Sequence, residues 1–203
     1  MDLTWFRIVT ILELFDKIPR DQFVPEEFKD FAYSDMQIQL EHDQRMLTPL
    51  EEASLLQKLE LKGHELVLEV GTGSGFLTAM LSRLCKQVIS IDYYESFAIH
   101  ARHALSLNHC NNVELITGDA CQGWLDRAPY DIIVFTGAIE KLNDTHRLQL
   151  LPGGKLFAIV GKAPVMQGQL HSLSHDGHWK MDVIFETNIP PLIDNLKSNE
   201  FAF

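Results

Sequence analysis

The sequence predicts an α/β fold, in which a doubly wound, mostly parallel sheet carries helices on both faces. The first observation is an apolar run of strand length, Leu66–Val70, that leads directly into a glycine-rich turn at residues 71–75. The second is the helical pattern after this turn, where apolar residues recur at three- and four-residue steps: Leu77, Met80, Leu81 and Leu84. The third is a continuous apolar run at residues 132–138, which is typical of a strand buried on both faces.

Strand, tight turn and helix in this order form the opening βα unit of a Rossmann-like, nucleotide-binding sheet. Hydrophobic periodicity places the remaining elements of the core along the chain. We predict helices at residues 5–18, 49–61 and 95–108, and strands at residues 66–70, 88–92, 113–117, 132–138 and 155–161. A turn formed by Pro152-Gly153-Gly154 is expected to precede the last of these strands.

Beyond residue 161 the pattern predicts two antiparallel strands, at residues 169–174 and 180–186, joined through the hairpin signal Asp176-Gly177. The tail ends in Phe201-Ala202-Phe203, and we expect these rings to dock on the body or on a second subunit. We therefore expect a single domain. Its predicted parts are an N-terminal helix and arm (1–49), a sheet core (50–161), and C-terminal strands with a tail (162–203).

The turn at residues 71–75 is predicted to bring a ligand close to the main chain. Its spacing is G-x-G-x-G, and Phe76 occupies the place of the third glycine in a dinucleotide fingerprint. Asp92 ends the next strand about 20 residues past the first glycine, where a ribose-binding carboxylate is expected. Glu69, just before the turn, suits a ligand with an ammonium or sulfonium charge. The alternative is a tight turn that binds no ligand.

Charge and composition exclude several classes of partner. The net charge is −11 and the isoelectric point is near 5.2, whereas nucleic-acid binding requires a basic surface. The same charge disfavours adhesion to an anionic membrane. No apolar run approaches the length of a membrane span, and the N-terminus lacks the pattern of a signal peptide. We expect a cytoplasmic protein with neither nucleic-acid nor membrane partners.

Cysteine and histidine spacing argues against a metal site. The three cysteines, Cys85, Cys110 and Cys121, form no C-x-x-C pair, which fits a reducing compartment. His100 and His103 share a helix face, but no further ligands of suitable type lie near them in the sequence. We predict that the protein holds no metal.

The glycine turn and its surroundings resemble a known family. Residues 69–75, E-V-G-T-G-S-G, resemble motif I of class I S-adenosylmethionine-dependent methyltransferases, in the form found in protein-L-isoaspartate O-methyltransferases. Residues 18–25, I-P-R-D-Q-F-V-P, and residues 32–35, A-Y-S-D, resemble segments specific to that branch. The resemblance extends over residues 18–161 and implies a donor, S-adenosyl-L-methionine, and a carboxylate acceptor.

An arm at residues 37–49 resembles the family stretch P-L-P-I-G-x-G-Q-T-I-S-x-P, with Gln44 and Pro49 fixing the alignment. In this alignment the serine that engages the acceptor carboxylate in the family falls on Leu47. Thr48 carries the nearby hydroxyl, but it points the opposite way in an extended segment. The resemblance therefore implies an acceptor site at Gln44, Leu47 and Thr48, with the serine substituted. The alternative is an arm that only packs on the sheet.

The resemblance also implies a set of donor-binding residues. The adenine contact falls on Asp119, because residues 118–124 resemble the family pattern G-D-G-x-x-G-W. Asp119 is also well suited to cap a helix, and the two roles are compatible. Thr136 is expected at the carboxyl end of its strand, where ligands bind in open α/β sheets. Spacing, position and resemblance together give the full predicted set of donor-binding residues: Glu69, Gly71, Thr72, Gly73, Ser74, Gly75, Asp92, Tyr93, Asp119, Ala120 and Thr136.

Three functions compete on this evidence. The first is a carboxyl methyltransferase that acts on isoaspartyl residues of proteins or peptides, as a monomer or homodimer. The second is a methyltransferase for another acceptor, because the family serine position is Leu47. The third is a non-catalytic interaction protein that retains the fold. A carboxylate acceptor requires no general base and no metal, since it is deprotonated near neutral pH.

Overall fold

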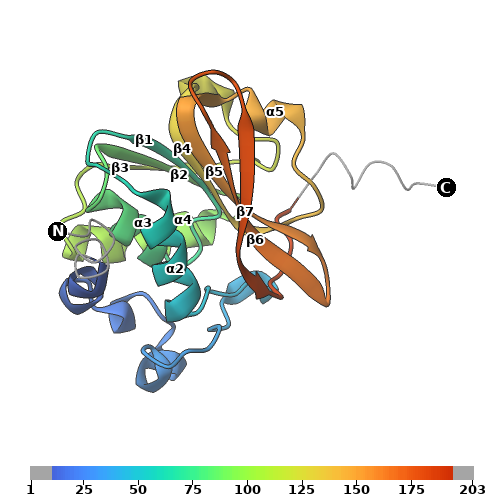
Figure 1. The fold of residues 1–203 in the computed structure, drawn as a ribbon. Helices are drawn as coiled ribbons and strands as arrows, with labels where there is room; N and C mark the ends of the chain where they lie inside the picture. Colours follow the sequence, from blue (N-terminus) through green and yellow to red (C-terminus); the bar gives the residue numbers. More distant parts are fainter. Residues whose placement is uncertain (1–10, 194–203) are drawn as a thin grey trace.

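The computed structural model describes residues 11–193. These residues form a seven-stranded sheet with the strand order β3-β2-β1-β4-β5-β6-β7 (Figure 1). The first five strands pair in parallel, whereas β6 pairs antiparallel with both β5 and β7. In chain order the strands span Leu66–Val70, Gln87–Asp92, Val113–Thr117, Tyr130–Ile139, Leu150–Lys162, Val165–Leu173 and Trp179–Thr187.

Helices cover the two faces of the sheet unequally. Helices α2, α3 and α4 lie over one face, and the short α5 lies on the other side of the sheet, beside β5 (Figure 1). The helices span Pro49–Leu59, Phe76–Ser82, Glu95–Leu107 and Asp144–Arg147. In the described part of the chain, four 3-10 helices occupy connecting segments: η1 Arg20–Gln22, η2 Glu26–Phe31, η3 Glu41–Asp43 and η4 Leu125–Arg127.

Each face of the sheet has its own apolar core. Side chains alternate between the two faces of a strand, so that Val67 packs with the helical face while Leu68 packs with the opposite face. Both side chains are completely buried. The central strands are therefore covered on both sides, as their continuous apolar runs predict.

The predicted fold class is confirmed, including the antiparallel pair that follows the parallel core. Most strand boundaries differ from prediction by one to five residues, and two differences have a local cause. Helix α2 ends at Leu59 rather than at residue 61, because Glu60 adopts a left-handed conformation with φ 58°. Residues 152–154, predicted as a turn, lie within β5, where the pairing with β4 shifts register.

Parts of the predicted N- and C-terminal segments lie outside the described residues. Residues 11–17 are helical, in agreement with the second half of the helix predicted at residues 5–18. Phe201 and Phe203 fall beyond the described part of the chain, and their docking stays a prediction. So does the division of residues 1–203 into three parts of one domain. Within residues 11–193, no helix is long and apolar enough to cross a membrane.

Arg20 joins the N-terminal segment to the arm and to α2. Its guanidinium is completely buried and donates to the Glu52 carboxylate (3.2 Å), to the Ala32 carbonyl (3.0 Å) and to the Leu47 carbonyl (2.6 Å). It also lies over the ring of Phe76 at the start of α3, 5.1 Å from the ring centroid. One side chain thus fixes where the arm leaves α2 and approaches the sheet.

We predict that Arg20→Leu lowers the free energy of unfolding by about 3–5 kcal/mol, because Glu52 is left buried without its partner. Denaturant unfolding at pH 8 measures this loss. The double variant Arg20→Leu/Glu52→Leu is the control and should recover part of it, since an apolar pair replaces the buried ion pair. A single variant as stable as the wild type would contradict the assignment.

Candidate active site

The glycine turn between β1 and α3 lies at the carboxyl end of the sheet and is fixed from two neighbouring strands. The Gly71 N–H donates to the Ile91 carbonyl of β2 (2.8 Å), and the Thr136 hydroxyl of β4 donates to the Gly71 carbonyl (2.6 Å). Gly71 has a φ of 99°, and a Cβ at this position would overlap the Thr136 hydroxyl. Only glycine fits here, and its backbone stays exposed to a ligand.

Asp92 ends β2 and orients the turn through its carboxylate. One oxygen accepts from the Gly73 N–H (2.9 Å) and the other from the Tyr94 N–H (3.0 Å). Burial raises the pKa of Asp92, and the backbone N–H donors around it oppose that shift. The Asp92 carboxylate is therefore held in one orientation at the edge of a cavity.

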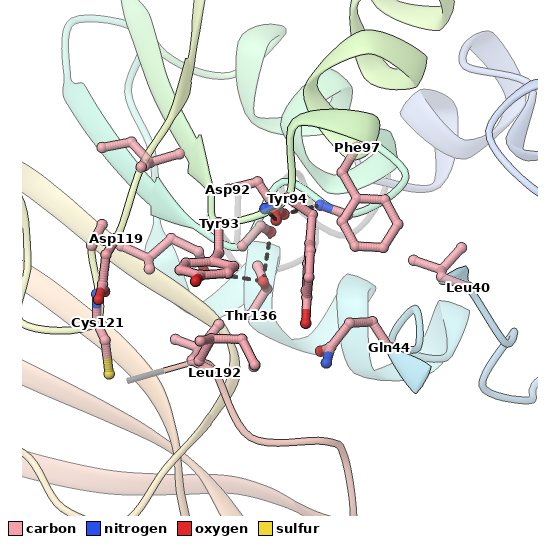
Figure 2. Close-up of a pocket in the computed structure, with 18 of the residues that line it drawn as sticks. Leu40, Gln44, Asp92, Tyr93, Tyr94, Phe97, Asp119, Cys121, Thr136 and Leu192 are labelled. Atoms are coloured by element: carbon pink, nitrogen blue, oxygen red, sulfur yellow. Dashed lines mark hydrogen bonds between the residues drawn. The ribbon is translucent and has the colours of Figure 1, made fainter. Parts of the chain in front are cut away.

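This cavity, which we call the donor cavity, encloses about 610 Å³ including its open mouth. Its floor comes from the carboxyl ends of β1, β2, β3 and β4, and its far wall from residues after β7. Figure 2 shows Asp92, Tyr93, Asp119 and Thr136 around it, with Gln44 of the arm opposite. Of the predicted donor residues, the structure brings seven to this cavity: Gly71, Gly73, Asp92, Tyr93, Asp119, Ala120 and Thr136.

Aromatic and apolar residues of the donor cavity were not identified from the sequence. They are Leu40, Tyr94, Phe97 and Leu192, all labelled in Figure 2. Tyr94 lies two residues after Asp92, and this position just beyond the end of β2 was the one sequence signal for its place in the cavity. Leu192 lies far along the chain, and the bridge between Ala138 and Pro191 brings it to this position.

A smaller cavity of about 350 Å³, which we call the arm cavity, lies on the other side of the glycine turn. It collects predicted residues that do not reach the donor cavity: Leu47, Glu69, Thr72 and Ser74. Gly71, Gly73, Thr136, Leu40 and Arg45 line both cavities, so the two meet at the turn. Predicted donor and acceptor residues therefore lie next to one another.

Three predicted site residues have other positions or roles. Gly75 packs against Ala101 of α4, where a Cβ would lie 2.8 Å from the alanine Cβ, and lines neither cavity. Thr48 caps α2: its hydroxyl accepts from the Glu51 N–H (3.2 Å), and its N–H donates to the Glu51 carboxylate (2.8 Å). Asp119 accepts from the Cys121 N–H (3.0 Å), but no helix begins there in the described chain, so the capping alternative is wrong.

Glu69 is completely buried beneath the turn. Its Oε2 accepts from the hydroxyls of Thr78 (2.5 Å) and Ser90 (2.6 Å), whereas Oε1 has no hydrogen-bond partner within residues 11–193. Burial raises the pKa of Glu69 to about 7, and the two hydroxyl donors oppose the shift. A buried carboxylate with an unsatisfied oxygen favours a cationic ligand group or a proton at this position.

The arm folds back on itself and is held against α4. The Leu40 N–H donates to the Gln44 carbonyl (2.8 Å), and His42 and Asp43 both have positive φ values, 55° and 57°. The His42 ring stacks on Tyr94 with centroids 3.8 Å apart and an angle of 4° between planes. This stacking places Leu40 and Gln44 at the wall of the donor cavity.

We predict that Glu69→Gln changes the pH dependence of stability. The folded-state pKa lies above the ordinary value of 4.5, so protonation of Glu69 stabilises the fold below about pH 4.5, and this contribution is lost as the pH rises through about 7. The neutral glutamine has no such loss. The variant should therefore gain about 3 kcal/mol relative to the wild type between pH 5 and pH 8.

Denaturant unfolding of both proteins at the two pH values tests this expectation. Glu52, whose pKa burial also raises to about 7, titrates in both proteins, and its charge is one of the smaller causes that raise the pKa of Glu69. An equal stability difference at pH 5 and pH 8 would contradict the assignment.

Comparisons with known proteins agree with this geometry. A family model described as protein-L-isoaspartate(D-aspartate) O-methyltransferase matches residues 5–197. Protein-L-isoaspartate O-methyltransferase 1 of Anaeromyxobacter sp. (strain Fw109-5) is 39% identical over 158 residues, which are 77% of this chain and 74% of that relative. The protein-L-isoaspartate O-methyltransferase of Caulobacter sp. (strain K31) is 32% identical over 92% of this chain and 85% of its own length.

Solved structures show the same fold. A protein-L-isoaspartate O-methyltransferase structure has a TM-score of 0.79 at 22% identity and covers 96% of this chain and 66% of that one. A putative protein-L-isoaspartate O-methyltransferase from Plasmodium falciparum, in complex with S-adenosyl-L-homocysteine, has a TM-score of 0.76 at 16% identity. It covers 90% of this chain and 89% of that one. Sequence and fold agree, and the chain belongs to the protein-L-isoaspartate(D-aspartate) O-methyltransferase family.

Proposed function

We propose that this protein transfers the methyl group of S-adenosyl-L-methionine to a carboxylate of isoaspartyl residues in proteins or peptides. The observation that carries the proposal is the junction of two cavities at one glycine turn. Predicted donor residues line the larger cavity, and the predicted acceptor position, Leu47, lines the smaller. Family membership and relatives of the same named activity support it.

The residues of the donor cavity fit S-adenosyl-L-methionine. Asp92 offers carboxylate oxygens for the ribose hydroxyls, and we assign the adenine contact to Asp119, which lines the same cavity beside Ala120. At Gly73 no side chain stands between the backbone and the cavity, so a ligand can approach the main chain closely. The unsatisfied oxygen of Glu69 lies behind this turn, where a positively charged donor would be stabilised.

The chain contributes position and exclusion of water rather than acid–base chemistry. When bound, the donor supplies an activated methyl group on a sulfonium. A carboxylate acceptor attacks without a general base, because it is ionised near neutral pH. Holding the two reactants in line can supply several kcal/mol of the barrier reduction. Leu40 and Gln44 of the arm form the wall that would shield the reacting atoms from solvent.

Leu47 favours a second candidate, a methyltransferase for a different carboxylate or another acceptor. Its side chain is 4% exposed and lines the arm cavity, so the hydroxyl of the family pattern is replaced by apolar surface. The neighbouring hydroxyl of Thr48 is engaged in capping α2 and does not substitute for it.

Methyl transfer from labelled S-adenosyl-L-methionine to an isoaspartyl peptide and to its aspartyl twin tests the proposal. We expect transfer to the isoaspartyl peptide alone. Calorimetric titration with the donor runs in parallel. Donor binding without transfer to either peptide would favour the second candidate, and absence of donor binding would contradict both.

We predict that Gly73→Val abolishes measurable donor binding while the protein stays folded. The isopropyl group would stand at the surface that the donor approaches, where the nearest described atom to a Cβ is Leu40 Cδ1 at 3.4 Å. Gly177→Val is the matched control, because Gly177 also has a positive φ, 86°, and has open space around it in a hairpin away from both cavities. It should bind the donor like the wild type. Wild-type affinity in Gly73→Val would mean that the turn binds no donor.

A further inference from the structure

Arg45 occupies the junction of the donor and arm cavities. It belongs to the arm and lines both cavities. Among the described residues, it is the one lysine or arginine that lines either of them. Arg45 falls where the family pattern carries threonine, two residues before Leu47.

The stem of the Arg45 side chain is fixed by a neighbour on the same arm. Gln39 and Arg45 form an antiparallel bridge, and Arg45 Nε donates to Gln39 Oε1 (3.2 Å). In the described part of the chain no hydrogen bond or ion pair uses the two Nη nitrogens. The guanidinium is therefore oriented through one nitrogen and keeps a pair of donors for a ligand, the geometry that suits a carboxylate.

The other charged residues that line the two cavities are acidic. Glu69 and Glu52 line the arm cavity, and Asp92 and Asp119 line the donor cavity. Glu52 is paired with the buried Arg20, whereas Glu69 and Asp92 have no cationic partner among the described residues. A carboxylate that enters this junction is repelled by these groups unless a cation offsets them. Arg45 is the cation in place to do so.

We propose that Arg45 binds a carboxylate at the junction of the two cavities. The inference rests on the proposed function. Two reactants carry a carboxylate there: the acceptor, and the methionyl end of the donor. In an extended segment residues two apart face the same side, so a guanidinium at residue 45 serves the same cavity as a hydroxyl at residue 47.

The test compares Arg45→Gln and Arg45→Lys with the wild type, and Arg102→Gln is the matched control. Arg102 is exposed on α4 and lines neither cavity. Calorimetry measures the affinity for S-adenosyl-L-methionine, for 5′-methylthioadenosine, which lacks the carboxylate, and for an isoaspartyl peptide in the presence of S-adenosyl-L-homocysteine. Transfer assays give kcat and KM.

If the acceptor is the source of the carboxylate, Arg45→Gln weakens peptide binding and raises KM about 10-fold while donor affinity is unchanged. If the donor is the source, its affinity falls about 10-fold and that of 5′-methylthioadenosine does not change. In either case Arg45→Lys restores part of the lost affinity, because lysine keeps the positive charge but cannot form the two parallel hydrogen bonds of a guanidinium. Raising the ionic strength reduces the difference in affinity between Arg45→Gln and the wild type.

Donor and peptide affinities of Arg45→Gln that both match those of Arg102→Gln would overturn the role of Arg45. Activity and affinity are read separately. Absence of methyl transfer by the wild type contradicts the proposed function, whereas unchanged affinities contradict the role of Arg45.

Discussion

The site depends on hydrogen bonds that fix one glycine turn to the ends of two strands, β2 and β4. Gly71 donates to β2 and accepts from Thr136 of β4, and Asp92 accepts from Gly73. These bonds determine where the backbone of the turn is open to a ligand, because a side chain at Gly71 would displace Thr136. The two cavities on either side of the turn follow from this single constraint. A parallel sheet brings such strand ends to one edge, which explains why residues far apart in sequence converge there.

The position of the arm is set by contacts that do not involve the side chain of residue 47. Arg20 holds the Leu47 carbonyl, and the stacking of His42 on Tyr94 holds the tip. The side chain at residue 47 can therefore change from hydroxyl to apolar without moving the arm away from the sheet. The arm can therefore keep its place while its chemistry changes. For this reason the identity of the acceptor depends on the side chains that line the cavities and not on membership of the family.

Local sequence patterns predicted most of the fold and part of the site. The run Leu66–Val70 with its glycine turn specified β1 and the start of α3, and Asp92 was found from its spacing alone. Residues brought in by tertiary contacts were not predictable: Leu192 reaches the cavity through a bridge to β4, and Arg20 is buried among three separate segments. The capping role of Asp119 was wrong because the chain after β3 turns without forming a helix there.

The charges around the glycine turn determine which ligands the site stabilises. The chain carries a net charge of −11, and three acidic side chains are buried around the turn: Glu69, Asp92, and Glu52, which is paired with Arg20. This arrangement stabilises a cationic donor and opposes an anionic acceptor, although the reaction requires both at one place. When a methyl group passes from a sulfonium to a carboxylate, both charges disappear. Before that step, an excess of negative charge at the site raises the free energy needed to bring the anionic acceptor into the cavity. A single guanidinium on the arm, placed where the two cavities meet, lowers that cost without crowding the donor. The charge distribution and Arg45 of the altered arm therefore bear on one step, the binding of a carboxylate where the two cavities meet.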